Sequence, residues 1–449
     1  MQAWHGQFKG VGPGVPSGED CLSVNVVAPV NPTGGSATGI PVMVFVHGGG
    51  YSAGSSRDFS GQGRGFVRGG RVIYVSFNYR LGALGYLDFS RYATAARPID
   101  SNLGLRDQVA ALAWVRANIA AFGGDPDRVT VFGESAGGNA VTTLLATPAA
   151  RGLFARAIAQ SSPASSVYSA ELSAKWAGEF IDALRSRLGE TGSPLAGDTE
   201  LAMLDGTSAT ELVTAALAIQ LSTPDAYPGT FCLAPVVDGE FLPEHPLVAI
   251  RAGRAHPVPL IIGTNDREGS IFVGRVDILP RSPRRIRALF RQAPPAAREA
   301  MRLAYPALPA RRAAADFGGD YAFWYPSVKV AEFHSSFAPV HSYRFDVAPR
   351  LLRLVGLDAT HGVEMHALFA EGRAPIARAM VALGGRDLYA GAGRRMRSNW
   401  LRFACGFPLV DWPEYTASER LTNIIGAVDR IESDPRGDRR RAWDAFLSL

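Results

Sequence analysis

The sequence predicts an α/β fold, in which helices flank both faces of a central, mostly parallel β-sheet. Two observations lead to this class. Several short segments are continuously apolar instead of alternating, as strands buried on both faces are. Segments with apolar residues three and four positions apart, the spacing of one helix face, separate them. Strands that alternate with helices favour a parallel sheet, because parallel neighbours need a long crossover between them.

Seven short and mostly apolar segments are expected to form the strands of this sheet. They are Leu22 to Ala28, Pro41 to Val46, Val72 to Phe77, Val129 to Phe132, Ala155 to Gln160, Val258 to Ile262 and Val340 to Phe345. In the sixth of them a proline stands near the start, where a missing backbone amide does least harm to strand pairing.

The clearest helix is predicted over residues 102–122, where apolar residues recur at helical spacing from Leu105 to Phe122. Two glycines directly after it supply a typical helix end. Further helices are expected over about 135–147 and from Met396 to Phe407.

Two longer blocks, about 165–225 and 280–335, are predicted to be mainly helical. We interpret them as insertions over the carboxyl-terminal edge of the sheet, where α/β enzymes bind their ligands. The whole chain, residues 1–449, is then expected to be a single domain that wraps one sheet.

Composition argues against several classes of partner. The 46 basic and 41 acidic residues leave a net charge of +5 without a long basic run, so a nucleic-acid partner is not expected. Three cysteines give no disulfide framework. The first residues lack the pattern of a signal peptide, and no apolar run reaches membrane-spanning length. We therefore expect a cytoplasmic protein without a stable membrane anchor, unless an export signal lies upstream. The sequence carries no signal for an oligomeric state.

The segment Val129 to Gly138 carries the strongest functional signal. Within it, Gly133-Glu134-Ser135-Ala136-Gly137 fits the G-x-S-x-G pattern, in which a serine hydroxyl is exposed on a tight strand-to-helix turn. The amides that begin the next helix favour negative charge at the same place. Ordinary glycine–serine turns share this spacing, so the motif gains meaning only with the partners that a serine nucleophile needs.

A second glycine-rich loop is expected to supply hydrogen-bond donors for the oxyanion that forms on attack. His47-Gly48-Gly49-Gly50 directly follows a predicted buried strand. Because glycines leave backbone amides unobstructed, Gly49 and Gly50 are candidate donors together with the amide of Ala136.

The carboxylate and the histidine of such a site follow the serine in that order. Glu268 lies just past a predicted strand, and Asp266 lies two residues earlier, so spacing does not separate them. Four histidines lie downstream. Of these, His361 stands in a loop beside a glycine, whereas His366 lies within the helix that follows.

The sequence contains no metal-ligand spacing, no phosphate-binding loop with its lysine and no G-x-G-x-x-G at the first helix. Chemistry without a metal or cofactor is therefore favoured.

Eight segments occur in an order that is typical of one protein family. They are Glu19-Asp-Cys-Leu-Ser-Val-Asn-Val26, His47-Gly-Gly-Gly-Tyr51, Asn78-Tyr-Arg-Leu-Gly82, Asn102-Leu-Gly-Leu-Arg-Asp-Gln108, Phe122 to Gly137, Gly263-Thr-Asn-Asp-Arg-Glu-Gly269, His361-Gly-Val-Glu364 and Asp411-Trp-Pro-Glu-Tyr415. Together they resemble the type B carboxylesterases, the family of bacterial para-nitrobenzyl esterases and cholinesterases.

The resemblance implies an α/β-hydrolase fold and a serine hydrolase that cleaves small-molecule carboxylic esters through an acyl-enzyme, without a cofactor. It implies Ser135 as nucleophile and His361 as base. It also favours Glu268 over Asp266, since the acid of the family directly precedes a glycine. The implied oxyanion amides are those of Gly49, Gly50 and Ala136.

Three features depart from the family. We expect its N-terminal strands to be largely missing, because the given sequence begins almost at Glu19-Asp-Cys21, and no cysteine precedes Cys21 in this sequence. Arg267 stands where an aspartate usually precedes the acid, which bears on how Glu268 is held. The alternative interpretation is a catalytically inactive member or fragment that acts in binding, although such relatives typically lose the serine.

A histidine general base leads us to expect that activity depends on pH. An unperturbed histidine has a pKa of about 6.5. The carboxylate of Glu268 is expected to raise the pKa of His361, and burial to lower it. We expect the two influences to offset each other partly, so that activity is low in acid and flat above neutrality.

Overall fold

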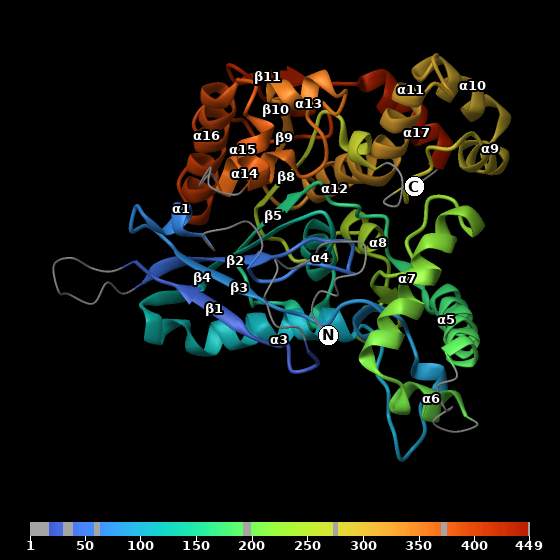
Figure 1. Cartoon of the computed structure of the whole chain (residues 1–449). Helices are drawn as coiled ribbons and strands as arrows, with labels where there is room; N and C mark the ends of the chain where they lie inside the picture. Colours follow the sequence, from blue (N-terminus) through green and yellow to red (C-terminus); the bar gives the residue numbers. More distant parts are fainter. Residues whose placement is uncertain are drawn as a thin grey trace.

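A computed structural model describes residues 18–29, 39–57, 63–191, 199–272, 277–369 and 375–447. Within these ranges the central sheet has nine strands (Figure 1). They are β1 (Val24–Val27), β2 (Ile40–Val46), β3 (Ile73–Phe77), β4 (Gly124–Glu134), β5 (Arg156–Gln160), β8 (Leu260–Asn265), β9 (Val340–Phe345), β10 (Leu421–Ile425) and β11 (Arg430–Ser433). Two short strands, β6 (Tyr168–Ser169) and β7 (Val236–Val237), form a separate pair.

The strand order is β1-β3-β2-β4-β5-β8-β9-β10-β11. All neighbours from β3 to β10 are parallel, and the two edge strands, β1 and β11, pair antiparallel. The prediction of an α/β fold with a mostly parallel sheet is therefore confirmed. Strand β4 lies between β2 and β5, so its carboxyl end reaches the middle of the sheet edge.

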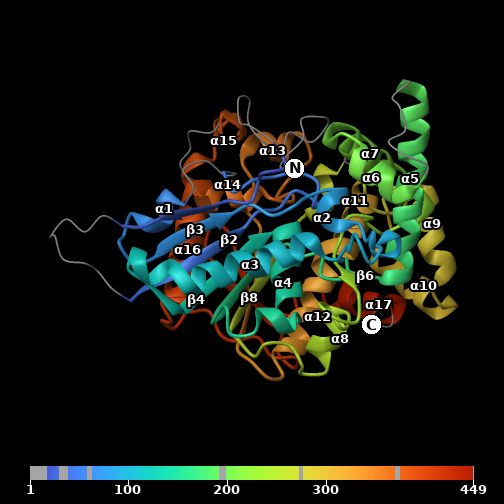
Figure 2. The same cartoon turned by 90° about the horizontal axis from the view of Figure 1, so that it is seen from below.

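Helices cover both faces of the sheet, which explains why its central strands are apolar throughout (Figure 2). Successive residues of a strand point to opposite faces. Thus Val131 packs in one core cluster with Leu112 and Val141, whereas Phe132 packs in another with Met396 and Trp400. The first face is covered by α3 (Leu103–Asn118), α4 (Ala136–Leu144), α8 (Pro246–Arg251) and α12 (Tyr325–His334). The second is covered by α1 (Arg64–Val67), α14 (Val363–Phe369) and α16 (Arg386–Ala404).

The two predicted helical blocks contain helices that gather at one end of the molecule (Figures 1 and 2). The first holds α5 (Ala170–Thr191), α6 (Glu200–Gly206) and α7 (Ala209–Ala226), with residues 192–198 outside the described ranges. The second holds α9 (Pro283–Gln292), α10 (Pro295–Ala304), α11 (Arg311–Gly319), the π-helix η6 (Asp320–Trp324) and α12. Gln220 of α7 donates to Ser52 Oγ beside the glycine-rich loop at 3.2 Å. Both blocks thus reach the sheet edge that carries the candidate residues, because Phe323 of η6 also lies against His361.

Several elements near the C-terminal part of the chain were not predicted. Strand β11 is exposed and its residues include Arg430 and Glu432, so it lacks the apolar pattern of a buried strand. Helix α16 begins at Arg386, ten residues before the predicted start, because its first turns are polar and partly exposed. The first turns of helix α17 (Gly437–Leu447) are rich in charged residues. Its buried residues are Arg440, Ala442, Trp443 and Phe446, which is too few apolar positions to show helical spacing clearly. No helix in the described ranges combines the length and apolarity that crossing a membrane requires.

Candidate active site

Ser135 stands on a sharp turn between β4 and α4. Its backbone has φ 60° and ψ −123°, which is strained for a residue with a side chain, and its amide donates to the carbonyl of Gln160 at 3.0 Å. The neighbouring glycines are sterically required. A Cβ on Gly137 would lie 2.1 Å from the carbonyl oxygen of Val46, and one on Gly133 would lie 2.6 Å from the backbone of Gly137. Close packing of the strand against the helix therefore dictates the glycines and lifts the serine out of the sheet.

His361 lies in the loop before α14 and contacts two of the other predicted residues. Its Nε2 is 2.8 Å from Ser135 Oγ, and its Nδ1 is 2.6 Å from Glu268 Oε2. In the neutral imidazole, the shorter contact with Glu268 favours the proton on Nδ1, so Nδ1 donates to Glu268 and Nε2 is left to accept from the serine hydroxyl. This is the tautomer that general-base chemistry needs.

The carboxylate of Glu268 is buried and fixed from two sides. Its side chain is 1% exposed. The oxygen that does not contact the histidine accepts from Ser161 Oγ at 2.7 Å and from the amide of Asn265 at 2.6 Å. Hydrogen bonds of this kind stabilise the ionised form of a buried carboxylate, which is the form that can hold a charged imidazole.

The competing residues lie elsewhere. Asp266 is partly exposed and pairs with Arg436 at 2.6 Å. Of the four downstream histidines, all within the described ranges, His361 alone contacts both Ser135 and Glu268. His334 binds the carbonyl of Val258, His341 binds that of Pro413, and His366 lies along α14.

Two further buried carboxylates surround the histidine, and sequence reasoning missed both. Glu134 Oε1 lies 3.2 Å from His361 Nε2. Glu364 accepts from Asn265 Nδ2 at 2.5 Å and from Gln160 Nε2 at 3.2 Å. The signal was present, since Glu134 directly precedes the serine and Glu364 ends the His361-Gly-Val-Glu364 segment.

The electrostatics of this cluster favour a charged imidazole. Burial lowers the pKa of His361, but the carboxylates of Glu134 and Glu268 outweigh burial and raise it to about 9. Burial raises the pKa of Glu134 to about 7, against the lowering influence of His361. Burial, together with the carboxylates of Glu134 and Glu268, raises the pKa of Glu364 to about 8. The cluster therefore has several groups that exchange protons near neutral pH.

The glycine-rich loop lies directly against the serine. A Cβ on Gly48 would come within 3.2 Å of Ser135 Cβ. Gly49 and Gly50 have φ of 108° and 60°, and the amides of Ser52 and Ala53 turn back onto the carbonyl of Gly49. In the described part of the chain, the amides of Gly49 and Gly50 donate to no backbone carbonyl. Ala136 is the first residue of α4, where helix amides also lack a partner within the helix.

Aromatic side chains form an apolar wall beside the histidine. The ring centroid of Phe323 lies 4.3 Å from that of His361, and the centroid of Phe272 lies 5.3 Å from it. The two phenylalanines stack on each other at 5.6 Å. Leu279 and Ala322 are buried in the same apolar cluster. This wall favours uncharged groups next to the reacting residues.

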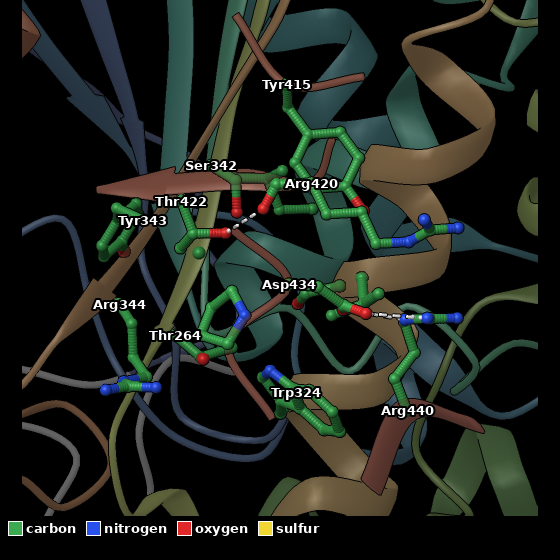
Figure 3. Close-up of a pocket in the computed structure, with 15 residues that line it drawn as sticks. Thr264, Trp324, Ser342, Tyr343, Arg344, Tyr415, Arg420, Thr422, Asp434 and Arg440 are labelled. Carbon is green, nitrogen blue, oxygen red and sulfur yellow. Dashed lines mark hydrogen bonds and ion pairs between the residues drawn. The ribbon is translucent and has the colours of Figure 1, made fainter. Parts of the chain in front are cut away.

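A separate cavity, lined by both polar and apolar side chains, lies beside strands β8, β9 and β10. Figure 3 shows Thr264, Ser342 and Thr422 of β8, β9 and β10 around it, with the ion-paired Asp434 and Arg440 on the opposite side. Its lining includes none of Ser135, Glu268 and His361, so it is distinct from the candidate active site.

The strand order, the serine turn between β4 and α4 and the helices on both faces are those of the α/β-hydrolase fold. Solved structures support this class directly. A PNB esterase aligns with a TM-score of 0.79 at 34% identity, covering 96% of this chain and 86% of the other. The carboxylesterase Est55 of Geobacillus stearothermophilus aligns with a TM-score of 0.78 at 32% identity, covering 96% and 88%.

Sequence comparisons identify the family within this class. The profile of the carboxylesterase family matches residues 2–420. The para-nitrobenzyl esterase of Bacillus subtilis (strain 168) is 36% identical over 430 residues, covering 94% of this chain and 82% of that protein. The cocaine esterase of Oryctolagus cuniculus is 32% identical over 437 residues, covering 92% and 76%. The chain belongs to the carboxylesterase family and is a carboxylic ester hydrolase, as the resemblance of its motifs predicted.

Proposed function

We propose that this hydrolase cleaves neutral carboxylic esters with Ser135 as nucleophile, His361 as general base and Glu268 as the acid that orients and stabilises the histidine. One observation carries the proposal. The imidazole of His361 bridges the two other residues, with Nε2 2.8 Å from the serine oxygen and Nδ1 2.6 Å from the carboxylate. These distances are within the hydrogen-bond reach that proton transfer requires.

In the acylation step, Ser135 Oγ bonds to the ester carbonyl carbon while its proton passes to His361 Nε2. The carbonyl electron pair moves to oxygen, which the amides of Gly49, Gly50 and Ala136 stabilise as an oxyanion. The imidazolium is held by Glu268, and the nearby carboxylate of Glu134 adds negative charge 3.2 Å from Nε2. The tetrahedral intermediate then expels the alcohol, which takes the proton from Nε2.

In the deacylation step, a water molecule takes the place of the alcohol. His361 Nε2 accepts a proton from the water as its oxygen bonds to the acyl carbon. The second tetrahedral intermediate collapses, the C–O bond to Ser135 breaks, and the serine oxygen recovers the proton from Nε2. The net reaction adds water to the ester and releases a carboxylic acid and an alcohol.

The substrate class follows from the surroundings of His361. Phe272 and Phe323 present apolar rings to the reacting groups, so an uncharged acyl or alcohol group is favoured there. The relative from Bacillus subtilis is named for para-nitrobenzyl esters, which makes these esters a reasonable first substrate for this chain.

The experiment that tests this function combines a substrate panel with active-site labelling. We expect hydrolysis of para-nitrobenzyl and para-nitrophenyl esters, with a rate that depends on acyl length. A fluorophosphonate should inactivate the enzyme in proportion to its attachment to Ser135, located by peptide mapping. Inactivation that tracks labelling of another serine would contradict the assignment.

A prediction about the acid distinguishes two neighbouring carboxylates. Glu268→Gln is expected to lower kcat about a thousandfold or more, because an amide favours the wrong tautomer of His361 and cannot stabilise its charge. The matched control, Asp266→Asn, should lower kcat less than about tenfold, because the carboxylate of Asp266 pairs with Arg436 and Arg344 and not with His361. Steady-state kinetics of both variants check this. A larger loss in the Asp266 variant would show that the wrong carboxylate was chosen.

A further inference from the structure

A buried arginine precedes the proposed acid, at the position where an aspartate is usual in the family. The side chain of Arg267 is 6% exposed, so its charge is almost fully removed from water. A buried charge is tolerated only where partners compensate for its lost hydration. The partners of Arg267 therefore indicate what it does.

The guanidinium of Arg267 joins three separate segments of the chain. Its Nε donates to Asp316 of α11 at 2.9 Å. Its Nη1 donates to the carboxylate of Asp358 at 2.8 Å and to the carbonyl of Gly356 at 3.1 Å. Gly356 and Asp358 belong to the loop that ends at His361, which we call the histidine loop (residues 356–361). One side chain thus ties the segment of the acid to the loop of the base.

Backbone contacts run alongside this ion pair. The amide of Arg267 donates to the carbonyl of Ala359 at 2.9 Å, and Arg267 forms an isolated parallel bridge with Thr360. Ser270 Oγ lies 2.7 Å from Thr360 Oγ1 and 2.6 Å from the carbonyl of Leu357. The acid segment and the histidine loop are therefore fastened together on both sides of Glu268.

The histidine loop needs such fastening because its backbone is strained. Asp358 has φ of 53°, in the left-handed region that favours glycine. A residue with a side chain keeps this conformation only where surrounding contacts fix it. The side chain of Arg267 can do so through the carboxylate of Asp358 and the carbonyl of Gly356.

We propose that Arg267 is a positioning residue that sets the contact between Glu268 and His361 by holding the histidine loop through Asp358. This inference rests on the proposed function of Ser135, Glu268 and His361. Arg267 touches no reacting atom, so its effect is on the alignment of the base. A displacement of about 1 Å in such a site costs roughly a hundredfold in rate.

The test uses Arg267→Lys, which keeps the positive charge but lacks the planar fork that reaches two carboxylates at once. Asp358→Asn removes the other end of the same contact and serves as a second variant. Arg312→Lys is the matched control, because Arg312 also pairs with Asp358, at 3.0 Å, but its side chain is 67% exposed. Titration with a fluorophosphonate gives the concentration of active sites, so that kcat is expressed per competent enzyme.

We expect kcat per active site to fall about ten- to hundredfold in Arg267→Lys and Asp358→Asn, with KM within about twofold of the parent. The carboxylates facing His361 are those of Glu134, Glu268 and Glu364. Because a loosened contact with Glu268 stabilises the imidazolium less, the acid limb of the kcat/KM profile should move to lower pH in both variants. Arg312→Lys should match the parent in kcat, KM and pH profile.

Two outcomes would overturn the proposal. An unchanged kcat per active site, with fewer active sites, would make Arg267 a residue of stability alone. An equal loss of kcat in Arg312→Lys would show that changing either arginine partner of Asp358 has the same effect, so that Arg267 has no particular role. Failure of the underlying function has a different signature, since the parent chain itself would then not be labelled at Ser135.

Discussion

Replacing Ser135 with alanine is expected to lower the turnover of para-nitrophenyl esters by about a millionfold, because the serine and the histidine act as one unit. The alanine variant retains the glycine-rich loop and the imidazole but has no oxygen to form the acyl-enzyme. What remains is the much slower attack of water on a bound ester, assisted by the oxyanion amides. The fold should be preserved, since the hydroxyl bonds to His361 and the backbone of the turn is held by the carbonyl of Gln160.

Single-turnover and steady-state kinetics on the purified variant check this expectation. Ser336→Ala is a suitable control, because that serine is exposed and bonds only to the carbonyl of Phe333 in its own helix turn. Its kinetics should equal those of the parent. If Ser135→Ala keeps more than about one per cent of the parental kcat, the nucleophile lies elsewhere, since even the loss of one oxyanion donor costs that much.

Loss of the base should have an effect of similar size. His361→Ala is expected to lower kcat/KM by about a hundred-thousandfold or more. No group is then left to accept the serine proton or to pass a proton to the leaving alcohol. His366→Ala is the matched control and should change the rate less than about fivefold, since His366 lies within α14, five residues beyond His361 in the chain. If His366→Ala abolishes activity while His361→Ala retains it, the general base is His366 instead of His361.

The parent enzyme should also show a pH dependence that His361→Ala abolishes. The base works as neutral imidazole, so kcat/KM rises with pH through the pKa of His361. The carboxylates of Glu134 and Glu268 raise that pKa to about 9, which keeps the inactive imidazolium populated to higher pH. The acid limb should therefore extend above neutrality. A midpoint at or below the ordinary histidine value of about 6.5 would contradict the dominance of the carboxylates over burial.

This pH dependence differs from the one that the sequence predicts. Sequence reasoning paired one carboxylate, Glu268, with one opposing influence, burial, and arrived at a plateau above neutrality. It did not include Glu134, which is adjacent to Ser135 along the chain and turns back toward the histidine. The direction of a side chain at a tight turn depends on the three-dimensional path of the turn, which local sequence does not reveal.

The central strands were predictable for a simple physical reason. Strands such as β2 and β4 are buried on both faces, and burial on both faces leaves a continuous apolar run. The edge strand β11 is largely exposed on both faces and carries Arg430 and Glu432, so it left no such pattern. The same distinction holds in the site. A local motif was enough to predict Ser135 as a site residue. The partners of Arg267 come from segments up to 91 residues away, so only the three-dimensional fold reveals them.

The pairing order of the sheet has a consequence for how the enzyme acquires activity during folding. Ser135 and His361 are 226 residues apart, and Glu268 and His361 are 93 residues apart. The turn that carries Ser135 follows β4, which pairs with β2 and β5, whereas the contact with His361 also requires β8 and β9 to pair in the same sheet. Contacts between such distant segments form slowly, because long loops must close first. Because activity is proposed to need both Ser135 and His361, we expect it to appear late in folding, and a chain arrested after β5 would present Ser135 without the base proposed for it.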